Sequence, residues 1–211
     1  EFIDKSPDTV LIAVQGPDTI ELIQDRFEIP DKFSTNYTES FLYARTGYTG
    51  EDGVEIMANN QDAESLLTFL IEKGIKPCGL GSRDTLRLEA SLPLYGFELT
   101  EDITPVEASL NWTITNKNEY LGSNRINDQL SGESHKVLKK FTIDSRKIAR
   151  TETVGIAGET KGIVTSGNFS PVLNKSIGFI LFENKPSHDL IEFDIRGNLI
   201  EGNIVNKRFL S

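Results

Sequence analysis

Short runs of apolar and β-branched residues mark the first half of the chain. Residues 9–14, 41–46 and 54–57 each form such a run, and runs of this kind predict β-strands. Gly16 and Pro17 follow the first run. Proline is favoured at the first position of a helix, because its missing N–H would have no partner there. We therefore expect this half to mix strands and helices.

The clearest helix is predicted over residues 61–73. Asn59 or Asn60 can cap its first turn, and Gly74 can end it. A further helix is expected from Ser82, a suitable N-cap, to residue 90. The apolar residues of the first helix recur at helical spacing and form one stripe: Ala63, Leu66, Leu67, Leu70 and Ile71.

Beyond residue 130 the pattern changes to strands separated by Gly, Asn and Pro. Residues 137–143, 162–165 and 177–182 are strand candidates, and residues 191–195 alternate apolar and charged side chains, as on a half-buried strand. Such a series is typical of an antiparallel barrel or sandwich. The small polar stretch SGES indicates a boundary, which predicts domains at residues 1–133 and 134–211.

The segment before this boundary carries the only tryptophan, Trp112. Leu110, Trp112 and Ile114 alternate along the chain, which predicts that Trp112 is buried on one face of a strand. Glu107 lies in the turn that begins at Thr104, and we expect it to brace that turn.

Composition narrows the functional classes. The 211 residues carry 32 acidic and 22 basic side chains, a net charge of −10, which disfavours binding to nucleic acid or to anionic membranes. No apolar run approaches the roughly 20 residues of a membrane-spanning helix. The single cysteine excludes an intrachain disulfide and fits a reducing compartment. Neither histidine, His135 or His188, belongs to a metal-ligand motif, so no metal site is predicted.

Residues 47–53 carry three glycines and predict a loop with unusual backbone freedom. The spacing is not a dinucleotide fingerprint, and Glu51 and Asp52 would repel a phosphate. Glu55 follows in a strand, between Val54 and Ile56, where a carboxylate must face either solvent or a partner. The pattern by itself leaves both open.

Arg83 and Arg87 are four residues apart and share one face of the predicted helix. Like charges at this spacing repel each other, so a negatively charged partner would be favourable. That partner is either a ligand or an acidic side chain of the fold, such as Asp84 or Glu89.

Several of these segments resemble the T-protein of the glycine cleavage system, a tetrahydrofolate-dependent aminomethyltransferase. The resemblance covers nearly the whole chain, in family order. It rests on ARTGYTGEDGVEI at residues 44–56, PCGLGSRDTLRLEA at 77–90, LPLYG at 92–96, TPVEASLNW at 104–112 and GIVTSGNFSP at 162–171.

The resemblance implies an α+β fold, with a ferredoxin-like folate-binding domain of antiparallel sheet and helices followed by a small antiparallel β-barrel. It assigns Glu55 to the N–H groups of the pterin, Tyr48 to the rim of the folate pocket, and Arg87 to the folate or nearby carboxylates. Arg83 is weighed as a further folate contact or a structural ion-pair partner. Tyr95 is either an aromatic wall of the pocket or a core residue.

The family takes an aminomethyl group from the lipoyl arm of the H-protein, releases ammonia and forms 5,10-methylenetetrahydrofolate. The segment VLIAVQGP, residues 10–17, lies well inside family members, which carry a further domain with an assisting aspartate upstream of it. We therefore expect this chain to be a C-terminal portion with no catalytic residue of its own, inactive in isolation. The resemblance places the protein in the cytoplasm if bacterial and in the mitochondrial matrix if eukaryotic.

Two alternatives remain open at the level of sequence. Folate-dependent demethylases and the C-terminal regions of dimethylglycine and sarcosine dehydrogenases share this architecture but use other one-carbon donors. A non-catalytic folate-binding module is the second alternative. Phe97 and Glu98 also stand where the family more often has Asn-Asp or His-Glu, which affects the predicted pocket rim.

Overall fold

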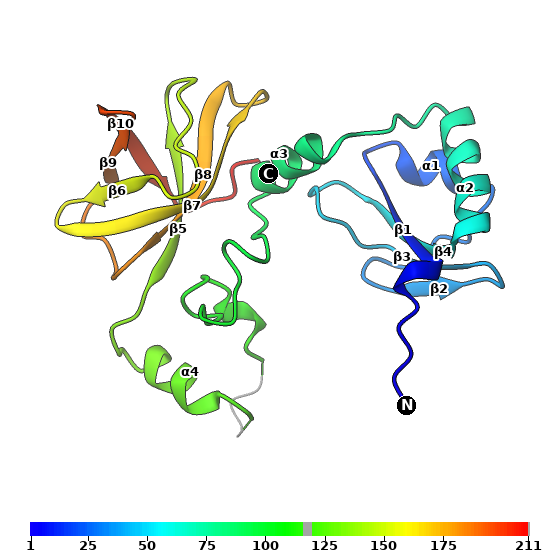
Figure 1. Ribbon diagram of the computed structural model, residues 1–211, viewed down its shortest axis with the longest axis horizontal. Coiled ribbons are helices and arrows are strands. Elements are labelled where there is room, and N and C mark those ends of the chain that lie inside the picture. Colours follow the sequence, from blue (N-terminus) through cyan, green and yellow to red (C-terminus); the bar gives the residue numbers. More distant parts are fainter. Residues whose placement is uncertain (116–119, 211) are drawn as a thin grey trace. The chain divides into compact units, whose positions relative to one another are not determined.

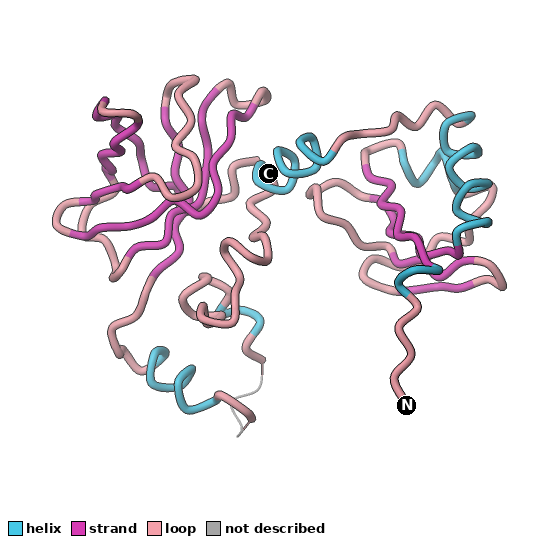
Figure 2. The backbone as a smooth tube through the Cα atoms, viewed as in Figure 1, coloured by secondary structure: helices cyan, strands magenta, loops and turns pink. Residues whose placement is uncertain are grey.

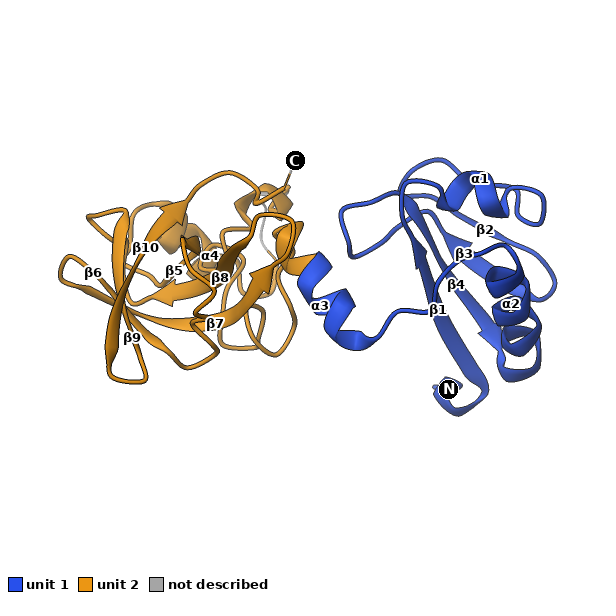
Figure 3. Ribbon diagram, turned by 90° about the horizontal axis from the view of Figure 1, so that it is seen from above, with its two compact units in different colours: residues 1–86 blue, residues 87–211 orange. Residues whose placement is uncertain are grey.

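A computed structural model describes residues 1–115 and 120–210 of the chain. These residues form two compact units, residues 1–86 and 87–211 (Figure 3). Helix α3 (Leu80–Glu89) begins in the first unit and ends in the second. The predicted domain boundary at residues 133/134 lies elsewhere and stays a prediction.

The first unit contains one antiparallel sheet with the strand order β1-β4-β3-β2. The strands are β1 (Thr9–Gln15), β2 (Thr35–Tyr37), β3 (Phe41–Ala44) and β4 (Gly53–Asn59). Because β4 pairs antiparallel with both β1 and β3, those two strands run parallel on either side of it. The short strand β2 was not predicted from the sequence.

Helices α1 (Thr19–Ile23) and α2 (Asn60–Glu72) cover one face of this sheet (Figure 1). The strand residues on that face alternate with exposed ones and join the helices in a core. We call the opposite side of the sheet the helix-free face. The core consists of Val14, Ile23, Phe27, Tyr43, Val54, Ile56, Leu66 and Leu70.

Helix α2 begins and ends one residue earlier than the predicted 61–73, and its predicted capping asparagine and terminal glycine are confirmed. The Asn59 side chain accepts a hydrogen bond from the Asp62 backbone N–H at 2.8 Å, which satisfies one of the free donors of the first turn. Gly74 follows the helix with a φ of +81°, in the left-handed region that glycine favours. Helix α1 begins at Thr19, two residues after Pro17, and α3 begins at Leu80, before the expected Ser82.

The second unit is dominated by a closed antiparallel barrel, which confirms the predicted barrel (Figure 2). The order around the barrel is β10-β5-β8-β7-β6-β9. Helix α4 (Ser123–Leu130) precedes it. This helix, β6 and β10 were not predicted from the sequence. The barrel strands are β5 (Val137–Ile143), β6 (Val154–Ala157), β7 (Thr160–Ser170), β8 (Lys175–Phe182), β9 (Leu190–Ile195) and β10 (Asn198–Val205).

Aromatic rings and glycines fit together inside the barrel. The rings of Phe141 and Phe193 are both fully buried, with centroids 4.6 Å apart. A Cβ at Gly178 would lie 2.5 Å from the Phe141 ring and 2.4 Å from the backbone oxygen of Ser166, so only glycine fits there. The rest of this core consists of Ile143, Ala149, Ala157, Val164, Ile180, Phe182 and Ile191.

The prediction that Trp112 is buried on a strand is wrong. Residues Asn111–Thr113 form a turn of 3₁₀ helix, and Trp112 is 78% exposed. The Thr113 backbone N–H and hydroxyl both donate to the Leu110 carbonyl, at 2.9 and 2.8 Å, which tightens the chain into this turn. Glu107 braces its turn as expected, because its carboxylate accepts the Thr104 N–H at 2.8 Å.

The predicted α+β class, with an antiparallel sheet and helices followed by a barrel, is confirmed. None of the helices in the described part of the chain is long and apolar enough to cross a membrane. Among the same residues, no group of three or more His, Cys, Asp and Glu side chains is arranged to hold a metal ion.

Candidate functional site

An internal ion pair closes the loop between β3 and β4 at its base. Arg45 donates two hydrogen bonds to the Asp52 carboxylate, from Nε to Oδ1 at 3.1 Å and from Nη2 to Oδ2 at 2.7 Å. The Gly53 N–H also donates to Asp52, and Lys32 lies 3.8 Å away. The Arg45 guanidinium holds the pKa of Asp52 down at about 2, against its usual 3.8, despite partial burial, which acts in the opposite direction.

This pair should make stability depend on pH. The folded pKa of Asp52 lies below the unfolded value, so the ionised pair stabilises the fold above pH 4, and this contribution is lost as the pH falls from about 4 to about 2. We expect Asp52→Asn to be less stable than the parent at pH 7 and to lose less stability across that interval. Urea unfolding at a series of pH values measures this, with the exposed Asp8→Asn as control. An unchanged pH slope in Asp52→Asn would contradict the prediction.

The Gln15 side chain, at the end of β1, holds the first half of the loop. Its amide oxygen accepts the Tyr48 N–H and the Thr49 hydroxyl, both at 3.2 Å, and its amide nitrogen donates to the Thr46 carbonyl at 3.1 Å. A Cβ at Gly47 would lie 1.8 Å from the Gln15 amide oxygen. The first loop glycine therefore makes room for the side chain that organises the loop.

Glu55 lies on the helix-free face of the sheet and is half-buried. It is the third residue of β4, which begins at Gly53. Its register partners are Ala13 on β1 and Ala44 on β3, so only methyl groups flank its carboxylate across the strands. The Thr46 hydroxyl donates to Oε2 at 2.7 Å. Within the described residues this is the one hydrogen bond of the carboxylate, and Oε1 stays open to a further donor.

An apolar row adjoins Glu55 on the same face. Leu11, Met57 and Leu42 lie side by side on β1, β4 and β3 in register, and each is 43–62% exposed. A carboxylate next to such a row can bind the polar edge of a flat ring while the apolar row contacts its face.

Tyr48 and Arg83 meet in the first unit. The Arg83 guanidinium carbon lies 5.0 Å from the centre of the Tyr48 ring, within cation–π distance. Arg83 also lines a cavity of about 330 Å³ with Gln15 and Thr49. The sequence prediction that these residues belong to one site is therefore consistent with their placement around one loop. Their role toward a ligand stays a prediction.

Arg87 has a different environment, in the second unit. Its side chain is 2% exposed, and it donates to Glu98 Oε2 and to the Leu92 carbonyl at 3.1 Å each, and to the Ser166 hydroxyl at 2.8 Å. The ion pair with Glu98 is the internal pairing that the sequence left open, with a carboxylate of the fold other than Asp84 or Glu89. A role in folate binding remains a prediction for Arg87, while its contacts favour a structural role.

The same buried Glu98 shapes the loop that carries Tyr95. Glu98 Oε2 accepts the Leu94 N–H at 2.9 Å, and the Gly96 N–H donates to the Leu99 carbonyl at 2.8 Å. Tyr95 stands at the tip and is 73% exposed, so the interpretation of Tyr95 as a core residue is wrong. An exposed aromatic ring on a braced loop is compatible with a pocket wall.

Two residues of these arrangements, Gln15 and Thr46, were not identified from the sequence, and Glu98 was named only at the predicted pocket rim, not as the partner of Arg87. Each of these side chains makes a hydrogen bond to a residue of another segment. The periodicity of apolar residues along the chain does not predict such contacts. The one local signal is that Gln15 and Thr46 belong to the two segments, VLIAVQGP and ARTGYTGEDGVEI, that resemble the family.

Two family models match the chain. The model described as the GCVT N-terminal domain matches residues 1–118, and that of the glycine cleavage T-protein C-terminal barrel domain matches residues 136–210. The second match coincides with the barrel strands β5 to β10.

Individual relatives agree with these models. The aminomethyltransferase of Synechococcus elongatus is 39% identical to this chain over 99% of its residues. That of Thermosipho melanesiensis is 38% identical over 98% of the residues of this chain. The chain spans only 59% and 60% of their lengths. The crystal structure of the glycine cleavage system aminomethyltransferase T from Bartonella henselae superimposes on this chain with a TM-score of 0.87 and 27% sequence identity. The match covers 96% of this chain and 60% of the Bartonella chain. The chain thus belongs to the glycine cleavage T-protein family.

Proposed function

We propose that this chain is the folate-holding portion of a tetrahydrofolate-dependent aminomethyltransferase of glycine cleavage. The whole enzyme would release ammonia from the aminomethyl-lipoyl H-protein and form 5,10-methylenetetrahydrofolate. The observation that supports this best is the Glu55 carboxylate, which stands half-buried on the helix-free face with an open oxygen. The proposed location of the protein is the cytoplasm if it is bacterial and the mitochondrial matrix if it is eukaryotic.

The donor chemistry of the folate fits this carboxylate. A pterin presents a ring N–H and an amino N–H side by side, and a carboxylate can accept both in one plane. The Thr46 hydroxyl donates to Glu55 Oε2 and fixes the carboxylate while leaving acceptor capacity on both oxygens. The apolar row of Leu11, Met57 and Leu42 offers a surface for the face of a ring.

The residues of this chain would bind and orient. Bound tetrahydrofolate would supply the nitrogens that accept the one-carbon unit. Glu55 would fix the edge of the pterin, and Tyr48 and Arg83 would border it. Positioning of this kind accounts for a large part of the rate gain in group transfer. No proton transfer is assigned to these residues.

The test is a calorimetric titration of the chain with tetrahydrofolate. We expect Glu55→Ala to bind at least tenfold more weakly than the parent, since a charged hydrogen-bonding pair contributes about 1.5–3 kcal/mol. Glu51→Ala is the matched control, because Glu51 is an exposed carboxylate of the same loop, and it should bind like the parent. Thermal unfolding of both variants should resemble that of the parent.

Equal affinity of the parent and Glu55→Ala would contradict the assignment of Glu55, and no binding by the parent would contradict a folate site within this chain. The one-carbon donor is tested separately, in the complete enzyme. Ammonia release from aminomethylated H-protein supports the proposal. Turnover with dimethylglycine or sarcosine instead would favour the demethylase alternative, and folate binding without any turnover would favour a non-catalytic module.

A further inference from the structure

The second unit contains a cavity with a marked positive charge. It has a volume of about 360 Å³, and Lys139, Lys140 and Arg208 contribute to its lining. None of the described residues that line it is acidic. The remaining wall is largely apolar and includes Leu92, Pro93, Leu110 and Phe179. We call this the basic cavity.

Among the described residues, the cations of the basic cavity have no acidic ion-pair partner. This holds for Lys139, Lys140 and Arg208 alike, although the chain carries a net charge of −10. Lys140 is partly buried, on the outer side of the barrel opposite Val205. Burial lowers the pKa of Lys140, and the neighbouring Lys139 and Arg208 lower it further. The fold therefore holds like charges together at a cost that a bound anion would relieve.

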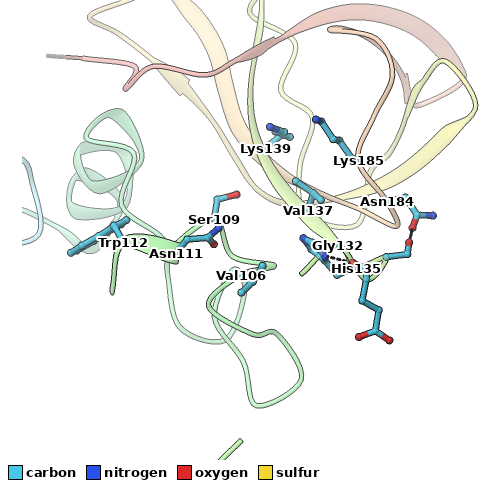
Figure 4. A pocket seen from close by; sticks show the side chains of 12 residues that line it. Val106, Ser109, Asn111, Trp112, Gly132, His135, Val137, Lys139, Asn184 and Lys185 are labelled. Carbon is cyan, nitrogen blue, oxygen red and sulfur yellow. Dashed lines mark hydrogen bonds between the residues drawn. The ribbon is translucent and has the colours of Figure 1, made fainter. Parts of the chain in front are cut away.

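A second, larger cavity adjoins the first, and Glu133 is among its lining residues. It measures about 880 Å³ and shares Ser109, Trp112 and Lys139 with the basic cavity. Figure 4 shows Lys139 and Lys185 on the same side of this hollow. Trp112, which is 78% exposed, lines both cavities, so it can report on a ligand in either.

We propose that the basic cavity binds a small anion with several carboxylates on a carbon chain. Two lysine ammonium groups and a guanidinium can each donate to a separate carboxylate, and the apolar wall can contact the methylene groups between them. The cavity volume suits a small molecule. A compact anion such as phosphate has no methylene groups for the apolar wall to contact. The high net negative charge of the chain disfavours a nucleic acid here.

Two sources carry this chemistry, a γ-glutamyl chain of the kind attached to folates and a free tricarboxylate. The experiment is a titration of the whole chain, followed by Trp112 fluorescence and calorimetry, with tri-γ-glutamate, tricarballylate and inorganic phosphate. We expect at least one of the two carboxylate probes to bind at least tenfold more tightly than phosphate, and more weakly as salt increases. Which of the two binds more tightly identifies the source.

Variants locate the binding. Lys140→Met and Arg208→Met should each weaken binding of the carboxylate probe by about tenfold, since each removes a charged donor. Lys207→Met is the matched control, because Lys207 is exposed and adjacent in sequence but does not line the cavity, and it should bind like the parent. Lys140→Arg keeps the charge and should retain most of the affinity even if Lys140→Met is destabilised.

The proposal would be overturned by a lack of binding to both carboxylate probes, by phosphate binding as tightly as they do, or by an equal loss of affinity in Lys207→Met. It does not depend on the folate site of the first unit. Glu55→Ala should bind tri-γ-glutamate like the parent, so the two proposals can fail independently.

Discussion

Replacing Arg87 with methionine is expected to lower the free energy of unfolding of the second unit by about 3–5 kcal/mol. The side chains of Arg87 and Glu98 are 2% and 0% exposed, and the variant would leave the Glu98 carboxylate buried without its cation. Glu98 Oε1 already has no hydrogen-bond partner among the described residues, so the carboxylate has little other compensation. Chemical unfolding followed by Trp112 fluorescence measures the loss, because the only tryptophan lies in this unit.

The double variant Arg87→Met/Glu98→Met provides the control. Removing both charges should restore much of the stability, since the penalty comes from the unpaired carboxylate rather than from the absence of the pair. The family resemblance instead implies that Arg87 contacts folate. If Arg87→Met unfolds like the parent but binds tetrahydrofolate more weakly, the structural role is wrong and the folate role is correct.

Replacing Phe141 with alanine is expected to destabilise the barrel by about 3–5 kcal/mol. The ring is fully buried, contacts Phe193 and packs over Gly178, so its removal leaves a cavity that the surrounding strands can fill only in part. Thermal and urea unfolding of the second unit measure the change.

Phe2→Ala serves as the comparison for this variant. Phe2 is fully exposed, and its removal should change stability by no more than about 0.5 kcal/mol. A loss in Phe141→Ala as small as that in Phe2→Ala would show that the barrel core does not depend on this ring.

Much of the fold follows from local sequence. Helix α2 has its cap, its apolar stripe and its terminal glycine within 16 consecutive residues, 59–74, and all three occur where the sequence predicts them. Strands β1, β4, β5 and β8 stand on runs of apolar residues and were likewise predicted. Strands β6 and β10 and helix α4 were missed, because barrel closure and packing decide their conformation more than their own residues do.

The sequence by itself determined the class of the fold, the position of Glu55 in a strand after a glycine-rich loop, and membership of a family through motifs that stay in order along the chain. Only the tertiary structure decided which side chains meet. Gln15 binds Thr46, 31 residues away, Arg87 pairs with Glu98 and binds Ser166, 79 residues away, and Trp112 is exposed. Periodicity records which face of an element is buried, whereas partner choice depends on register and packing between distant segments, which no local pattern contains.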